Sequence, residues 1–264
     1  MEPDPPLSVL GSTAVSVAAC RAVESVRIDA WFHDELARHV VTTAGFPPTL
    51  SRGLVAWVAV RTRFLDELVK NTVADGVSQI VIVGAGLDSR AYRLDLARDV
   101  TVFEVDHGDV LSMKQQLLDD IELFSTCRRL VVVADLVDDD WLALLMATGW
   151  VPERATLWIV EGLLVYLTHE ERTRLLKRLA AASGPRDVGS GGSVLGATLS
   201  TRTDNLAHPL WHPADAADPV EWLSECGWRA NVQTMAQVSE EFGRPVSPEF
   251  RTSTKGRLVR ATLV

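Results

Sequence analysis

Glycines and acids that follow two apolar segments are the residues of this sequence best suited to hold a ligand. Gly84 and Gly86 come directly after the β-prone run QIVIV, and Asp106 ends a second such run, TVFEVD. A glycine turn after a buried strand lets the backbone bend tightly and lets a ligand approach closely. An acid about 20 residues past such a turn is the arrangement that binds ribose hydroxyls in nucleotide-binding folds. We therefore expect a nucleoside-containing ligand, the alternative being a plain strand-to-helix turn.

The negative charge of Asp88 helps to distinguish between possible nucleoside ligands. It stands two residues after Gly86, where the segment SRAYRLDLA is expected to begin a helix with its free N–H groups facing the ligand. A dinucleotide-binding turn prefers Gly or Ala where this sequence has Ser89, and an acid repels a pyrophosphate. An acid suits a ligand with a positive centre and no phosphate, such as S-adenosylmethionine. Asp88 could equally cap the helix.

The pattern of apolar residues indicates an α/β fold. Up to residue 76 the chain has helical spacing, as in AWFHDELARHV and TLSRGLVAWVAVRTRFLDELVKNTV. From residue 77 on, seven short runs rich in Val, Ile and Leu alternate with helical segments for most of their length, which predicts a mostly parallel, doubly wound sheet. We expect a helical extension over residues 1–76, forming a lid, and a ligand-binding domain over residues 77–264.

Composition narrows the class of protein. The 264 residues carry a net charge of -9, which argues against general affinity for nucleic acid or for an anionic membrane surface. No apolar run approaches the roughly 20 residues of a membrane helix, and three scattered cysteines are typical of reduced thiols. We expect a cytoplasmic protein that acts on a small molecule. The sequence gives no oligomeric state.

The ordered motifs GAGLDSRAYRL, VFEVD, ADL and EGLLVYL resemble the leucine carboxyl methyltransferase family. The similarity runs from about Arg61 to the C-terminus and is greatest to the bacterial branch of S-adenosylmethionine-dependent and polyketide O-methyltransferases. The resemblance implies a class I methyltransferase fold, a Rossmann-like sheet of seven strands whose last strand is antiparallel. It also implies S-adenosyl-L-methionine as the cofactor.

At the methionyl end of that cofactor, the resemblance assigns Gly84 to the floor and Glu161, in EGLLVYL, to the ammonium group. Arg61, in VRTRFLDE, matches an arginine that the family uses on the cofactor carboxylate, although Arg63 lies only two positions away. We expect the remaining turn residues, Gly86 and Asp88, to border the cofactor as well.

At the nucleoside end, the resemblance assigns Asp106 to the ribose and Asp135 with Leu136, in ADL, to the adenine. His107 departs from the family pattern, which often has a proline or an apolar residue after this acid. Glu104 shares the face of its strand with Asp106, and we expect it to have a supporting role.

No catalytic residue is assigned from the sequence. Tyr166, His208 and His212 are the candidates, the two histidines on a long loop after the fifth strand. Prolines beside both histidines disfavour the helix that a metal-binding pair at this spacing needs, so we expect no metal site. The predicted function is O-methyl transfer. The alternatives are an NAD(P)-dependent oxidoreductase and a non-catalytic regulatory protein that binds the cofactor.

Overall fold

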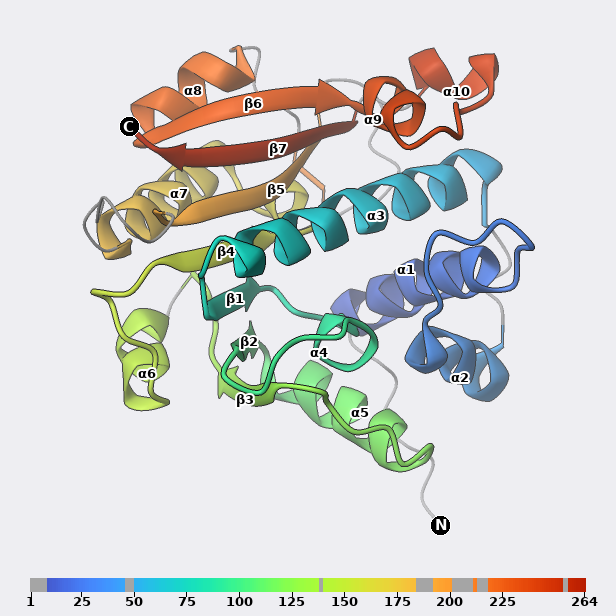
Figure 1. The fold of residues 1–264 in the computed structure, drawn as a ribbon, viewed down its shortest axis with the longest axis horizontal. Helices are drawn as coiled ribbons and strands as arrows, with labels where there is room; N and C mark the ends of the chain where they lie inside the picture. Colours follow the sequence, from blue (N-terminus) through green and yellow to red (C-terminus); the bar gives the residue numbers. More distant parts are fainter. Residues whose placement is uncertain are drawn as a thin grey trace.

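Seven strands form a single mixed sheet in the computed structural model, which describes residues 9–45, 50–137, 140–183, 192–200, 211–212, 218–253 and 256–264. The strand order is β3-β2-β1-β4-β5-β7-β6 (Figure 1). The strands are β1 (Gln79–Val83), β2 (Thr101–Asp106), β3 (Arg128–Val133), β4 (Thr156–Val160), β5 (Val194–Ser200), β6 (Trp228–Thr234) and β7 (Gly256–Leu263).

The sheet has the predicted topology. Strands β1 to β5 pair in parallel with one another, whereas β7 pairs antiparallel with both β5 and β6. Every residue of β1 and β4 is buried, as expected for central strands that are covered on both faces. The strand order reverses between β1 and β4, and a parallel sheet binds its ligand at the carboxyl ends of the strands beside such a switch point.

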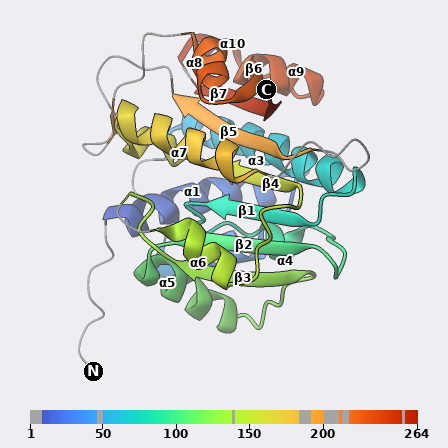
Figure 2. The ribbon, with the colours of Figure 1, turned by 90° about the vertical axis from the view of Figure 1, so that its left-hand side faces the viewer.

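Helices pack on both faces of the sheet. They are α1 (Val9–Ser25), α2 (Glu35–Ala44), α3 (Arg52–Ala74), α4 (Arg90–Arg93), α5 (Gly108–Asp119), α6 (Trp141–Ala147), α7 (His169–Ala182), α8 (Pro219–Glu225), α9 (Met235–Glu241) and α10 (Pro248–Ser253), with a 3-10 turn η1 (Leu164–Tyr166). Helices α6, α7 and α8 cover one face and α3, α4 and α5 the other, with α1 and α2 beyond the second layer (Figures 1 and 2).

Two helix predictions need correction. The stretch AWFHDELARHV is helical only from Glu35, because Asp34 is extended and its side chain accepts a hydrogen bond from the amide of Ala37, which caps α2. The helix predicted after the glycine turn is only four residues long, because Leu94 returns to an extended conformation.

The N-terminal helices are held to the C-terminal part of the chain as well as to the sheet. Trp31 packs edge-on against Phe242, with ring centroids 6.0 Å apart. The guanidinium of Arg244 lies 3.5 Å from the Trp31 ring centroid and 2.8 Å from the buried carboxylate of Glu24. None of the helices in the described part of the chain has both the length and the apolar character needed to cross a bilayer.

Candidate cofactor site

The glycine turn is joined to the end of β2 through Asp106. Gly84 and Gly86 have φ angles of +71° and +48°, which glycine adopts without strain. The Gly86 amide donates to Oδ2 of Asp106 at 2.6 Å, and the His107 amide donates to Oδ1 at 2.7 Å. Burial raises the pKa of Asp106, and the two amide hydrogen bonds partly oppose that rise. Each carboxylate oxygen keeps a lone pair for a further donor.

Asp88 turns its carboxylate into the protein. One oxygen accepts a hydrogen bond from the Arg90 amide at 2.7 Å, and the other pairs with the Arg90 guanidinium. Burial alone would raise the pKa of Asp88, but the charges of Arg90, Lys114 and Arg93 and the Arg90 amide hydrogen bond together hold that pKa below its usual range. Because its carboxylate is occupied and α4 has only one turn, this helix start offers a ligand little.

Glu161, directly after β4, is held between two arginines. Its Oε1 lies 2.8 Å from Nε of Arg61, and its Oε2 lies 2.7 Å from Nη2 of Arg90. Burial would raise the pKa of Glu161, and the charges of Arg90 and Arg61 more than reverse that effect. The Arg61 contact is an ion pair without hydrogen-bond geometry, so this Nε still lacks a hydrogen-bond partner among the described residues.

Arg61 and Arg63 lie on different faces of α3. Arg61 is buried beside Glu161, whereas Arg63 pairs with Glu67 at 3.1 Å and lies over the ring of Phe242. Of the two arginines that the sequence left open, only Arg61 reaches the end of β4.

Arg90 is the centre of a larger set of buried charges. Its Nε lies 2.9 Å from Asp66 of α3, and Asp66 also pairs with Arg93. Arg93 donates to the hydroxyl of Ser89 at 3.1 Å, so the motif DSRAYR supplies four members of one connected network.

The network continues into the N-terminal helices. The Ser89 hydroxyl donates to Oδ2 of Asp34 at 2.6 Å, and Nε of Arg21 lies 2.7 Å from the same oxygen. Arg21 also donates to the Leu87 carbonyl in the glycine turn at 2.6 Å. The carboxylates and guanidiniums of this network are here called the Arg90 cluster: Arg21, Asp34, Arg61, Asp66, Asp88, Arg90, Arg93 and Glu161.

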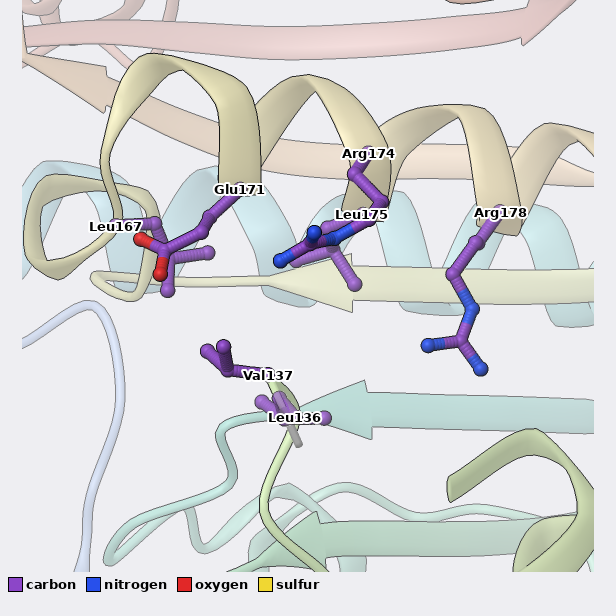
Figure 3. Close-up of a pocket in the computed structure, with 7 residues that line it drawn as sticks. All are labelled: Leu136, Val137, Leu167, Glu171, Arg174, Leu175 and Arg178. Atoms are coloured by element: carbon purple, nitrogen blue, oxygen red, sulfur yellow. The ribbon is translucent and has the colours of Figure 1, made fainter. Parts of the chain in front are cut away.

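Asp135 and Leu136 follow β3 at the same edge of the sheet. Asp135 accepts a hydrogen bond from the Val137 amide at 2.8 Å, which fixes the turn. Leu136 lines a small pocket between this turn and α7 (Figure 3). The residues that line the pocket are Leu136, Val137, Leu167, Glu171, Arg174, Leu175 and Arg178.

Two of the three candidate catalytic residues lie near each other. The His212 amide donates to the Val165 carbonyl at 2.8 Å, and Val165 and Tyr166 both belong to the turn η1, which follows Glu161. His208 lies outside the described residues. The structure thus places His212 and Tyr166 beside the same turn, close along the chain to Glu161.

A family model for leucine carboxyl methyltransferases matches residues 14–180, well over half of the chain. The chain belongs to the leucine carboxyl methyltransferase family. A relative from Streptomyces avermitilis is 36% identical over 273 residues, covering 95% of this chain and 94% of its own. One from Frankia alni is 36% identical over 274 residues, covering 95% and 93%. Both carry the name "Putative S-adenosyl-L-methionine-dependent methyltransferase".

Solved structures show the same fold at low sequence identity. A crystal structure of a DUF574 family protein from Streptomyces avermitilis matches with a TM-score of 0.59 at 14% identity, over 95% of this chain and 97% of that one. Magnesium protoporphyrin IX methyltransferase from Synechocystis, solved with its bound S-adenosylhomocysteine, matches with a TM-score of 0.52 at 15% identity, over 86% and 93%. The predicted family, the class I methyltransferase fold and S-adenosyl-L-methionine as cofactor are confirmed.

Sequence reasoning missed most of the Arg90 cluster in this family member. Arg21 and Asp66 come from helices, and Asp34 precedes one, in a part of the chain that was read only for its apolar spacing. All three are buried, and a charged residue on the apolar face of a helix was the signal that could have revealed Arg21 and Asp66.

Proposed function

We propose that this methyltransferase transfers the methyl group of S-adenosyl-L-methionine to an oxygen of a small, largely apolar natural product of polyketide type. When bound, the cofactor supplies a methyl group on positively charged sulfur. The acceptor oxygen takes that methyl as the carbon–sulfur bond breaks and the electron pair returns to sulfur. The chain's contribution is to align the two reactants and exclude water.

The observation that carries this proposal is the pairing of Arg61 with Glu161 at 2.8 Å beside the glycine turn. An amino-acid group has a carboxylate and an ammonium, and an arginine beside a glutamate offers each of them an opposite charge. Asp106, at the end of β2, has lone pairs available for ribose hydroxyls, and Leu136, after β3, offers an apolar contact for adenine. The donor set therefore fits the two ends of this cofactor.

The N-terminal helices, residues 1–76 in the sequence prediction, act in this proposal as the lid. A Cβ added to Gly86 would lie 3.8 Å from the methyl of Ala14, so α1 passes directly over the glycine turn. Arg61 of α3 anchors the lid to the cofactor carboxylate, and the Arg90 cluster ties α1 and α2 to the same turn.

A carboxylate is the favoured acceptor. It is already ionised at pH 7 and needs no base, whereas a phenol with a pKa near ~10 is mostly protonated there. Tyr166 and His212 are the described candidates for a base, and His208 stays a candidate from the sequence.

A screen of carboxylic acids and phenols, followed by release of S-adenosylhomocysteine, tests the proposal. With a carboxylate acceptor we expect a rate that is flat between about pH 6 and 8. A phenol that depends on a histidine should instead lose rate as the pH falls through ~6.5. If the double variant His208→Gln, His212→Gln abolishes such an acid limb, the carboxylate preference is wrong. Turnover of neither class would contradict the O-methyl assignment.

A further inference from the structure

A second set of buried charges lies on the strand that carries Asp106. Oε2 of Glu104 is 2.7 Å from Nζ of Lys114 in α5 and 2.8 Å from Nη2 of Arg129 in β3. Glu104 and Lys114 are both 0% exposed. The other carboxylate oxygen, Oε1, has no hydrogen-bond partner among the described residues. These three residues are here called the Lys114 cluster.

The Lys114 cluster has one acid and two cations, so its pairs leave one positive charge over. A single cation would neutralise Glu104, and Arg129 alone could provide it from its partly exposed position over the Tyr92 ring. A fully buried lysine is uncommon, and a buried ion pair is seldom better for stability than apolar side chains of similar size. Neutralising Glu104 therefore does not account for a second cation, Lys114, at this carboxylate.

Acids at the cofactor site face this surplus charge. Glu104 and Asp106 project from the same face of β2 because they are two residues apart. The charged groups with the largest electrostatic effect on Lys114 are Glu104 from β2, Asp88 from the glycine turn and Arg129 from β3, and Lys114 in turn favours the charged form of Asp106. Burial lowers the pKa of Lys114, and the charges of Glu104 and Asp88 only partly oppose that effect.

We propose that Lys114 is a positioning residue of the cofactor site, whose buried charge keeps Asp106 ionised for binding the ribose hydroxyls. Asp106 needs such help because it is largely enclosed, and burial disfavours its charged form. The groups that most favour that form are the amides of Gly86 and His107, the His107 ring and Lys114. This role of Lys114 deepens the proposed function and rests on it, since it requires the ribose to bind at Asp106.

The role predicts a specific pH dependence. Burial already raises the pKa of Asp106, so this carboxylate takes up a proton at a higher pH than an exposed aspartate does. Loss of the Lys114 charge should raise that pKa further. Affinity for the ribose would then fall off at a higher pH on the acid side, while affinity at alkaline pH, where Asp106 is ionised in either case, would change little.

Lys114→Met and Arg129→Met form a matched pair for the test, because each removes one of the two cations bound to the same oxygen of Glu104. The dissociation constant of S-adenosylhomocysteine is measured by calorimetry from pH 5 to 8 for both variants and the wild type. For Lys114→Met we expect the acid midpoint of binding to rise by roughly 0.5–1 pH unit, as expected when one nearby charge is lost. We expect Arg129→Met to shift the midpoint less, because Arg129 is partly exposed and water screens its charge.

Equal midpoints in Lys114→Met and the wild type, or an equal shift in both variants, would overturn the role of Lys114. The second result would mean that the Lys114 cluster only supports the fold. If the wild type itself fails to bind S-adenosylhomocysteine, the proposed function fails instead. If Lys114→Met does not fold, Lys114→Gln replaces it, because that side chain carries no charge but can still donate a hydrogen bond.

Discussion

The two buried charge clusters flank the same glycine turn and differ in composition and reach. The Arg90 cluster has four acids and four arginines, drawn from α1, α3, α4, the residue before α2, the glycine turn and the end of β4. The Lys114 cluster has one acid and two cations on β2, α5 and β3. A balanced cluster that joins many elements is suited to hold them in place, whereas a surplus charge acts on the groups around it.

The difference explains why the motif DSRAYRL need not touch a ligand to matter. The side chains of this motif form hydrogen bonds and ion pairs with one another and with Asp34, Asp66 and Glu161. The motif residues involved are Asp88, Ser89, Arg90 and Arg93. In the proposed function the motif therefore acts through Glu161, which Arg90 holds in place, and through the N-terminal helices, which it fastens to the turn.

Among substitutions in the two clusters, replacement of Arg90 should have the largest effect on stability. Arg90→Met removes a guanidinium from three buried carboxylates, on Asp66, Asp88 and Glu161, and leaves Asp88 without an ion pair among the described residues. Breaking a single buried pair costs about 3–5 kcal/mol, so we expect at least that loss in the free energy of unfolding, measured with urea. Lys70→Met is the control, because its exposed pair with Glu67 should be worth less than about 1 kcal/mol. A loss of under about 1 kcal/mol for Arg90→Met would mean that the cluster does not hold the fold together.

Asp34 tests whether the Arg90 cluster fastens the N-terminal helices. Asp34→Asn removes the charge that faces Arg21 but keeps an N-cap for α2, whereas Asp34→Ala removes both. We expect losses of about 3 kcal/mol for Asn, and about 1 kcal/mol more for Ala, in the free energy of unfolding. Hydrogen exchange should show faster opening of α1 and α2 than of β1. Uniform loss of protection across the sheet would argue against a separate fastening role.

Arg61 and Arg63 of α3 form a matched pair that tests whether the buried arginine, and not the surface one, binds the cofactor. We expect Arg61→Ala to weaken binding of S-adenosylhomocysteine about 10- to 100-fold, the range for a lost charged hydrogen bond of about 1.5–3 kcal/mol. Arg63→Ala should change it less than about twofold, because its side chain pairs with Glu67 on another face. Calorimetry on both variants decides the matter, and equal effects would remove Arg61 as the anchor of the lid.

The smallest expected effect is a difference in how the free energy of unfolding depends on acid pH. The cluster's arginines hold the pKa values of Asp34, Asp88 and Glu161 below their usual range against the effect of burial. A carboxylate whose pKa is lower in the folded than in the unfolded protein stabilises the fold at pH values above its unfolded pKa, about 4. That contribution is lost as the pH falls from there through the folded pKa. The wild type should therefore lose stability below about pH 4, and Arg90→Met should lose less of it, by about 1–2 kcal/mol. Urea unfolding at pH 3 and pH 6 measures the difference, and parallel losses would contradict the assigned cause.

The sequence by itself determined the sheet and the positions of the candidate ligand residues. Runs rich in Val, Ile and Leu predicted the central strands, because parallel strands covered on both faces must be apolar on both faces, and strand-like patterns near the C-terminus predicted β6 and β7. The order of motifs placed Gly84, Asp106, Asp135 and Glu161 at strand ends. Parallel strands bring such positions to one edge, so their proximity follows from topology.

Only the tertiary structure decided which charges meet. Arg90 of α4 lies 24 residues after Asp66 and pairs with Glu161, which follows β4, and no local pattern records such pairings. Helical periodicity could not choose between Arg61 and Arg63, because the choice depends on how α3 rotates against the end of β4. Nor could it show that Glu104 would be left with two cations. Apolar spacing is a property of one segment, whereas an ion pair in the core exists only when two segments have packed together.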